Sequence, residues 1–340
     1  IKRLGSSSIV TTLITGGLVT SPYGIAIDGD DNVFVTCGNR ILRIPTTGAN
    51  AGIATAVVGA IYGSGPTYLA GNGTSSRFKN PTVLAFSTNY DSLYVADSGN
   101  HVIRSVYMAD GLYTTELIAG TPMSAGLVDG LAGSFQGSKF ENPNGLAIDY
   151  EGNIYVADTG NNTIRLIYTG PGGTPYVRTF AGPSTNPPNP VGTNKPDQAP
   201  YSETSSLTDA RFFGPVSLAV DSVGQKLYVS DSQNYIIRSI DLVTELVSNY
   251  IGSGAQGFTQ AFNYNSQLNL PAGLFLDNLN YMYIADSANN AVIQITPNAA
   301  FGWYLQAALA GSTGSTGAIG LAGATGATGA IGYGLGVTLQ

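Results

Sequence analysis

The sequence predicts an all-β protein: a β-propeller of five, or six, four-stranded blades, followed by an extended polyproline-II or collagen-like tail. A two-strand hairpin pattern occurs five times, each copy preceded by a short apolar strand and followed by a strand that ends in glycine. Repeats of roughly 60 residues with four short strands each are typical of propellers. The tail is predicted because glycine stands at every third residue from Gly311 to Gly332.

The hairpin pattern is clearest at Leu93–Val106, which reads LYVADSGNHVIRSV. Its first strand is β-branched and aromatic, as strands prefer. Asp97–Asn100 follows, where Asp and Asn can bond to local backbone and Gly accepts a positive φ, so a tight turn is expected. A second strand completes the hairpin. The other copies are Val33–Ile44, which is two residues shorter, Ile154–Ile167, Leu227–Ile240 and Met282–Ile295.

Each hairpin is flanked by two further strands. The preceding strand begins at a proline and is rich in Ala and Gly, which suits a propeller axis where backbones approach closely. The following strand ends at a glycine such as Gly120 or Gly182. Each unit therefore runs from an inner strand through the hairpin to an outer strand. The expected inner strands are 22–28, 81–87, 143–149, 215–221 and 271–277, and an aromatic residue recurs at one place: Phe34, Tyr94, Tyr155, Tyr228 and Tyr283.

These units closely resemble the NHL repeat, whose pattern is Pro-x-Gly-(apolar)-Ala-(apolar)-Asp, then Gly-Asn-(apolar)-Tyr-Val-Ala-Asp-x-Gly-Asn-x-x-Ile-Arg. Gly152–Asn161 matches it almost fully, and the resemblance covers about residues 8–311. It implies NHL-type propeller blades. An Asp that recurs at the same place in four of the five units indicates a structural role, namely turn hydrogen bonds and pairing with the recurrent Arg.

Two units depart from this pattern. In the first, Cys37 stands near the place of the Asp, and in the fifth, Gln294 is taken to stand at the place of the recurrent arginine. These two units are expected to lose an inter-strand ion pair. The arginines of the other three units are Arg104, Arg165 and Arg238.

Three regions are expected: residues 1–16 as an N-terminal strand, 17–310 as the propeller and 311–340 as the Gly-X-Y tail. Ser8–Gly16 reads as an outer strand with no hairpin before it. Either five blades carry a spare strand, or a sixth blade is incomplete. The strand could close its own ring or pair with the exposed sheet edge of a neighbouring subunit.

Composition disfavours two classes of partner. The formal net charge is −7, and no cluster of Lys and Arg occurs. Binding to a phosphate backbone or to an anionic membrane surface needs such clusters, so neither is expected. No apolar run approaches the ~20 residues of a membrane helix, and hence no membrane span is expected. With one cysteine, an intrachain disulfide is impossible.

No enzymatic activity, cofactor or metal site is expected. Propeller enzymes work at the axis with several converging side chains on a metal, and amidating lyases of the NHL family need several His ligands for zinc. This chain has one histidine, His101, in a hairpin turn, and one distant cysteine. The sequence also lacks a G-x-S-x-G nucleophile motif.

The tail is expected to assemble copies of the chain, because only glycine fits the axis of a collagen-like or polyglycine bundle. The glycines of this stalk are Gly311, Gly314, Gly317, Gly320, Gly323, Gly326, Gly329 and Gly332. Possible glycosylation sites are the sequon residues Asn72 and Asn161 and the tail residues Thr313, Thr316, Thr325 and Thr328.

The leading functional hypothesis is a non-enzymatic structural subunit of an extracellular or surface fibre, filament or spike, with a propeller head on an oligomerising stalk. Location outside the cell, or on a cell or virion surface, is expected with it. One alternative is a head that binds a glycan or a protein. Another is a lactonase-like or lyase-like propeller enzyme, which the single histidine disfavours.

The tail generates a prediction about assembly. Ordering one residue costs about 1–2 kcal/mol, and a Gly-rich strand has few side chains to bury in return, so we expect order only in a bundle of three or more chains. The full-length protein should sediment as a trimer or larger, and a variant that ends at Ala310 as a smaller species. Gly323→Val should weaken assembly and leave the propeller folded. Equal monomeric sedimentation of the full-length and shortened proteins contradicts the stalk.

Overall fold

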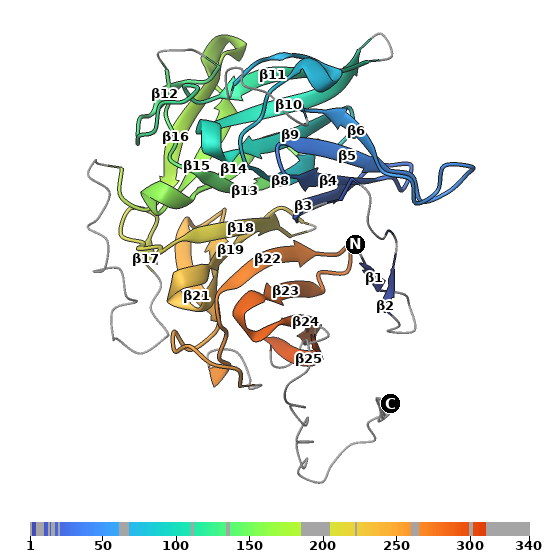
Figure 1. Ribbon diagram of the computed structural model, residues 1–340. Helices are drawn as coiled ribbons and strands as arrows, with labels where there is room; N and C mark the ends of the chain where they lie inside the picture. The colour runs from blue at the N-terminus through green and yellow to red at the C-terminus, as the bar shows by residue number, and fades with distance from the viewer. Residues whose placement is uncertain are drawn as a thin grey trace.

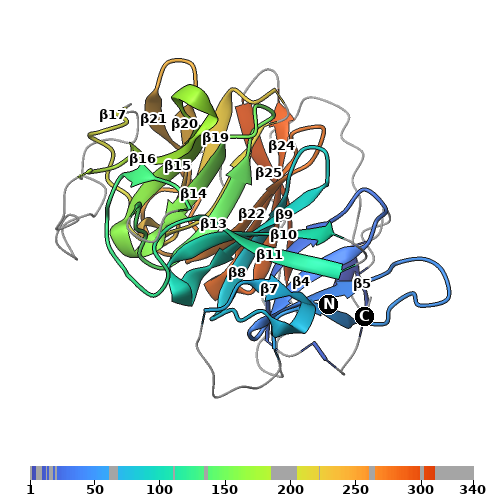
Figure 2. The same ribbon diagram turned by 90° about the horizontal axis from the view of Figure 1, so that it is seen from above.

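The computed structural model describes residues 2–4, 10–12, 14, 18–19, 21–60, 68–109, 112–133, 137–184, 205–221, 223–259, 265–298 and 302–310. Five antiparallel sheets are arranged around a common axis (Figures 1 and 2). Helical structure within these residues is limited to short 3-10 turns. The prediction of an all-β, five-bladed propeller is therefore confirmed, whereas the predicted tail lies outside the described residues.

Each blade runs from an inner strand at the axis to an outer strand at the periphery. Blade one contains β3 (Pro22–Ile27), β4 (Val33–Cys37), β5 (Arg40–Ile44) and β6 (Thr55–Val58). Blade two contains β8 (Pro81–Phe86), β9 (Ser92–Asp97), β10 (Val102–Ala109) and β11 (Leu112–Ala119). Blade three contains β13 (Pro143–Ile148), β14 (Ile154–Asp158), β15 (Thr163–Thr169) and β16 (Pro175–Ala181). Blade four contains β18 (Pro215–Val220), β19 (Lys226–Asp231), β20 (Ile236–Asp241) and β21 (Leu246–Ile251). Blade five contains β22 (Pro271–Leu276), β23 (Met282–Asp286), β24 (Ala291–Asn298) and β25 (Gly302–Ala310).

Three blades also carry a short fifth strand, which the sequence does not predict. These strands are β7 (Gly71–Asn72), β12 (Gly130–Leu131) and β17 (Ser205–Ser206), and each pairs with the outer strand of its blade. Each belongs to the connection that leads into that same blade. The connection thus folds back over the outer edge and pairs part of a strand edge that would otherwise be open.

The five recurrent aromatic residues occupy equivalent places, as predicted. Each pairs with the same position of its inner strand, which is Ala in four blades and Phe275 in blade five. Their surroundings differ in one case. Tyr155 and Tyr228 are buried, whereas Tyr283 of blade five borders the cavity on the axis.

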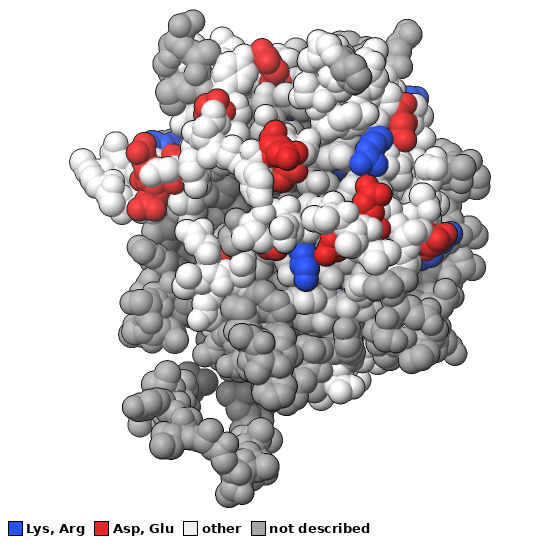
Figure 3. Space-filling model, turned by 180° about the vertical axis from the view of Figure 1, so that it is seen from behind, with Lys and Arg blue, Asp and Glu red and all other residues white. Residues whose placement is uncertain are grey.

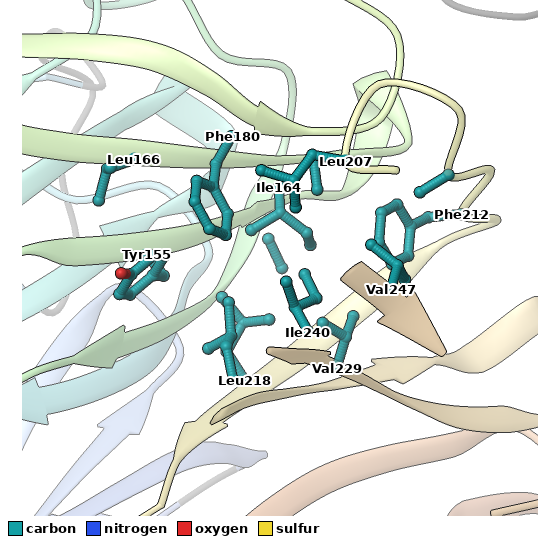
Figure 4. Close-up of a cluster of buried hydrophobic side chains, with 14 of the residues drawn as sticks. Tyr155, Ile164, Leu166, Phe180, Leu207, Phe212, Leu218, Val229, Ile240 and Val247 are labelled. Carbon is teal, nitrogen blue, oxygen red and sulfur yellow. The ribbon is translucent and has the colours of Figure 1, made fainter. Parts of the chain in front are cut away.

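The hydrophobic core lies between blades. Between blades three and four, Ile164 and Phe180 belong to the same cluster as Leu218 and Ile240 (Figure 4). Similar clusters join blades one and two, two and three, and four and five. Fully burying one such side chain contributes about 1.5–3 kcal/mol, so each blade depends on its neighbours for much of its stability.

A buried arginine fastens blade two to the connection that enters it. Arg104 lies 3.3 Å from the Asp97 carboxylate and donates to the carbonyl oxygen of Arg77 at 2.6 Å. Its guanidinium lies over the ring of Phe78, 4.1 Å from the ring centroid. The other carboxylate oxygen of Asp97 accepts a hydrogen bond from the Lys79 amide at 2.8 Å. One ion pair therefore ties the second and third strands to the incoming chain.

Blades three and four repeat this arrangement, as the recurrence of Asp and Arg predicts. The carboxylate–guanidinium distances are 3.0 Å for Asp158 and Arg165 and 2.7 Å for Asp231 and Arg238. In each blade the aromatic residue three positions before the inner-strand proline lies under the guanidinium. These residues are Phe140 and Phe212.

Blade one lacks the ion pair, as expected. Cys37 pairs with Pro22 at the place where Asp97 pairs with Pro81, so a thiol replaces the carboxylate. A buried arginine without a carboxylate at that place would be costly. The residue at the arginine place is Leu42, which is fully buried.

Blade five also lacks the ion pair, but the prediction that Gln294 stands at the place of the arginine is wrong. Ile293 stands there, because it pairs with Ile284 in the register that pairs Arg104 with Val95. Gln294 lies one residue further along β24. Its amide donates to the Tyr283 hydroxyl at 3.0 Å. Leu268 stands where blades two to four have phenylalanine, so the aromatic ring and the guanidinium are absent together.

The N-terminal segment belongs to none of the five blades. β1 (Lys2–Leu4) and β2 (Val10–Thr12) form a separate two-stranded antiparallel sheet. Blade five has its own outer strand, β25, so the predicted strand at Ser8–Gly16, of which residues 10–12 and 14 are described, does not complete that blade. Ile14 packs against a cluster of blade one that contains Val33, Val35 and Ile44.

The arginine contacts predict the effect of removing one partner. Arg104→Leu should lower the free energy of unfolding by about 3–5 kcal/mol, because Asp97 is left buried without its cation. Arg104→Leu combined with Asp97→Asn should recover part of this loss. Denaturant unfolding measures both effects. Lys226→Leu, at an exposed strand position, is the control and should change the free energy by less than about 0.5 kcal/mol. Equal effects of Arg104→Leu and Lys226→Leu contradict the interpretation.

The same carboxylates predict a pH dependence. Burial raises the pKa of Asp97 and Asp158 to about 6, above the value of about 3.9 in an unfolded chain. The folded state then binds these protons more tightly, so their contribution to stability is complete below about pH 4 and declines as the pH rises to about 6. The difference in unfolding free energy between the natural protein and the Asp97→Asn, Asp158→Asn variant should therefore change across this range. A difference that is constant from pH 4 to pH 7 contradicts the prediction.

Candidate functional site

The inner strands surround a cavity of about 700 Å³ on the propeller axis. Its lining comes from all five inner strands and from Tyr283, Ala285 and Val292 of blade five. Apart from Ser217 and two tyrosines, the lining residues are apolar, proline or glycine, and none is Asp, Glu, His, Lys, Arg or Cys. The cavity therefore suits apolar groups.

Glycine and side-chain hydroxyls let the inner strands approach one another. A Cβ atom on Gly24 would lie 2.1 Å from the carbonyl oxygen of Thr82 in the next blade, so no larger residue fits there. The Thr36 hydroxyl donates to that same carbonyl at 2.7 Å. Between blades four and five, the Ser230 hydroxyl donates to the carbonyl of Pro271 at 2.6 Å. These contacts use the polar groups of the inner strands and leave apolar side chains toward the axis.

Groups with acid–base or metal-binding chemistry lie away from this cavity. His101 follows the 3-10 turn Ser98–Asn100, and its Nδ1 accepts a hydrogen bond from the Asn142 amide at 3.1 Å. Burial lowers the pKa of His101, which favours the neutral imidazole. The buried Cys37 thiol donates to the carbonyl of Leu18 at 3.3 Å. Within the described residues, no cluster of three or more His, Cys, Asp or Glu is placed to hold a metal ion.

The inner strands that line the cavity end at the turns between the first and second strands of the blades, of which residues 28–32, 87–91, 149–153, 221, 223–225 and 277–281 are described. We call this end of the cavity its mouth. The inner strands lead to these turns, since Phe86, Ile148, Val220 and Leu276 line the cavity just before them. Four of the five turns expose a large apolar side chain. We call these four residues the apolar collar: Tyr90, Tyr150, Val223 and Leu279.

Contacts with neighbouring groups hold parts of the apolar collar in place. The Tyr150 hydroxyl of blade three donates to the backbone carbonyl of Val223 in blade four. The ring of Tyr90 packs on Phe86, with 5.8 Å between the ring centroids. Leu279 is 70% exposed. The collar thus combines anchored aromatic rings with free apolar surface.

The same five turns carry carboxylates but no Lys or Arg. Asp149 closes its turn by accepting a hydrogen bond from the Asn153 amide at 2.9 Å, and the aspartates of three other turns do likewise, as the sequence predicts. Hydrogen bonds from Ser87 and Asn89 lower the pKa of Asp91. Acidic groups are also common on the side of the molecule in Figure 3, where basic ones are few. The carboxylates of the turns are Asp28, Asp30, Asp31, Asp91, Asp149, Glu151, Asp221 and Asp277.

The structure places the two sequons differently. Asn72 is exposed, and its side chain accepts a hydrogen bond from Thr114 at 3.2 Å. Asn161 is only 1% exposed, and its amide nitrogen donates to Asp158 at 2.8 Å and to the carbonyl of Gly126 at 2.9 Å. A glycan on Asn161 would require these buried contacts to break. The eight predicted stalk glycines and the four tail threonines lie outside the described residues.

Sequence reasoning did not identify the apolar collar. Its four members stand at three different offsets within their turns and differ in type, so no repeated motif marks them. A signal was available in the turn composition, because five short turns with many carboxylates and no cation lie at the same end of five inner strands. The described residues contain no helix of the length and apolarity that crossing a membrane requires.

Comparison with known proteins agrees with the repeat pattern. Residues 14–241 match the family model of the teneurin NHL domain. NHL repeat-containing protein 2 of Bos taurus is 31% identical over 176 residues, which is 50% of this chain and 22% of that protein. Protein SUPPRESSOR OF QUENCHING 1, chloroplastic, of Arabidopsis thaliana is 26% identical over 238 residues, which is 69% of this chain and 21% of that protein. The chain thus spans about a fifth of the length of these curated relatives.

Solved structures with a similar fold include a streptogramin B lyase, at 14% identity and a TM-score of 0.48, covering 86% of this chain and 71% of that one. An auxiliary nutrient binding protein from Bacteroides thetaiotaomicron has 16% identity and a TM-score of 0.46, covering 71% of this chain and 50% of that one. The repeated blades and the match of the family model to most of the propeller lead to one conclusion: the chain belongs to the teneurin NHL domain family.

Proposed function

We propose that the propeller is a non-catalytic binding module for a basic polypeptide segment that carries an exposed apolar side chain. The observation that carries this proposal is the position of the apolar collar, surrounded by turn carboxylates, at the mouth of a cavity without a charged lining residue. The apolar side chain would enter the collar and the cavity. Lys or Arg residues beside it would face the carboxylates.

The two parts of this surface have different energetic roles. Burying an apolar side chain contributes about 25 cal/mol per Å² removed from water, so the collar supplies most of the affinity. Exposed ion pairs contribute only about 0.2–1 kcal/mol each and are weakened by salt. The carboxylates act mainly by attracting a basic partner and excluding an acidic one.

This surface favours a polypeptide over a glycan. Recognising a sugar requires hydrogen bonds to its hydroxyl groups, and the cavity lining offers Ser217 and two tyrosine hydroxyls as its polar side chains. The Ser217 hydroxyl already accepts a hydrogen bond from the Leu274 amide at 3.1 Å. An enzymatic role at the axis would be favoured by a carboxylate, an imidazole or a metal ligand, and no Asp, Glu, His or Cys is among the described residues that line the cavity.

The proposal extends to assembly on the basis of the glycine period alone. A tail that joins three or more chains would present several heads together, as a surface fibre or spike does. Linked heads bind a multivalent partner more tightly than one head because the second contact is intramolecular. The location of the protein outside the cell is part of this proposal.

A peptide display experiment tests the binding proposal. Random peptides selected on the full chain should be enriched in an aromatic or large aliphatic residue flanked by Lys or Arg. Leu279→Asp should reduce binding of the selected peptides by about tenfold or more. Raising the salt concentration from 0.05 to about 0.5 M should weaken binding several-fold, because it screens the carboxylates.

Val243→Asp is the matched control. Val243 is 73% exposed, compared with 70% for Leu279, but it lies in the turn between the third and fourth strands, away from the axis. This control should bind the peptides as the natural protein does. Equal losses in Leu279→Asp and Val243→Asp, or selection of acidic peptides, would contradict the proposed site.

A further inference from the structure

The five blades leave an opening on one side of the axis. Neighbouring inner strands pack against each other from β3 through β8, β13 and β18 to β22. Within the described part of the chain, β22 and β3 make no packing contact of comparable extent. We call the face that a blade turns toward the next blade in the chain its trailing face, and the opposite face its leading face. At each of the four closed interfaces, the trailing face of one blade packs against the leading face of the next blade.

The leading face of blade one is exposed at its inner strand. Ile25 is 54% exposed, whereas the residues at the same register position in the other four blades are between 3% and 9% exposed. The residue types are alike, so the difference comes from a missing neighbour and not from the sequence. The four buried equivalents are Leu84, Leu146, Leu218 and Leu274.

The trailing face of blade five shows the same difference. Val292 of β24 is 40% exposed, and its equivalents in the other four blades are fully buried. Phe275 and Tyr283 of this blade line the axial cavity together with Val292. The buried equivalents of Val292 are Ile41, Ile103, Ile164 and Ile237.

A glycine in the inner strand lets the backbone of a following blade approach closely in two of the blades. Cβ atoms on Gly24 or Gly145 would lie less than 3 Å from backbone atoms of the following blade. Gly273 stands at the same place in blade five, yet a Cβ there would meet only the Ala285 side chain, at 3.4 Å. Blade five thus has the glycine that permits close backbone approach in blades one and three, although no following strand of the five blades lies there.

We propose that the β1–β2 sheet of this chain, together with Ile14, seats in the opening as the outer part of a sixth blade. β1 and β2 form the one described sheet outside the five blades, and they lie on the side of the molecule where blades one and five are apart (Figure 1). Ile14 already packs against Val33 and Val35, which are on the leading face of blade one.

Two hydrogen bonds hold Leu18 beside blade one as well. The guanidinium of Arg40 donates to the carbonyl of Leu18 at 3.2 Å, and the Cys37 thiol donates to it at 3.3 Å. Ile14 and Leu18 are thereby both held beside blade one. The β1–β2 sheet, which precedes these residues in the chain, can then cover Val292 of blade five with its other face. This is the position that a blade takes between two neighbours.

Chemical cross-linking tests the proposal in the full chain. In a Cys37→Ala background, Val292→Cys is paired with Val10→Cys or with Thr11→Cys, because adjacent strand residues face opposite sides. A short bismaleimide should link one of these pairs within one chain at least about tenfold faster than the control pair Val243→Cys and Thr11→Cys. Links between two chains would overturn the proposal in favour of a second copy in the opening. Equal rates in all pairs would also overturn it.

Limited proteolysis gives a second readout that needs no cysteine. Trypsin should cleave after Lys2 and Arg3 slowly in the natural protein, because the sheet is held between two blades. Val292→Asp, which places a charge on the proposed contact, should speed this cleavage by about tenfold. Val243→Asp should not change it. Equal cleavage rates in the natural protein and Val292→Asp would overturn the proposal.

Discussion

Every blade of this propeller has two apolar faces, and the rest of the structure depends on covering both. A four-stranded sheet alone cannot bury its own side chains. The clusters between blades therefore contain residues from two sheets, such as Phe34 with Leu93 or Ala96 with Ile154. Three blades have a neighbour on each side. Blades one and five each lack a neighbouring blade on one side, and the exposed positions Ile25 and Val292 mark where this requirement is not fully met.

The buried ion pairs solve a second problem, which is how each connection is held to the blade it enters. In blades two to four, carbonyl groups of the incoming chain point at a guanidinium that is itself neutralised by Asp. Burial opposes both charges, since it raises the pKa of Asp97 and lowers the pKa of Arg104. The charges persist there because hydrogen bonds satisfy them on several sides. Blade five manages without the cation by placing Ile293 and Leu268 there, so the pair specifies geometry more than it supplies stability.

The sequence predicted the features that repeat and missed those that do not. Hairpins, inner prolines and the Asp–Arg pairs recur in type and spacing, so their positions followed from pattern alone. Gln294 was misassigned by one residue because nothing in blade five resembles arginine, and only strand register identifies Ile293 as its counterpart. The extra strands β7, β12 and β17 depend on tertiary packing of irregular connections. The apolar collar lies in turns of unlike sequence, and it becomes a surface only when five turns meet at one mouth.

The separation of charge from the axis follows from the same packing requirement. A carboxylate placed among the apolar side chains that line the axis would need a partner that the Ala- and Gly-rich strands cannot supply. Carboxylates are therefore kept in the turns, where Asp28 and Asp149 bond to nearby amides and Asp30 and Asp31 are exposed to solvent. The apolar lining ends where the turns begin, so the boundary between apolar and acidic surface coincides with the mouth of the cavity. A ligand at this mouth meets both kinds of surface at once, because the fold that keeps charged groups off the axis gathers carboxylates in the turns around the mouth.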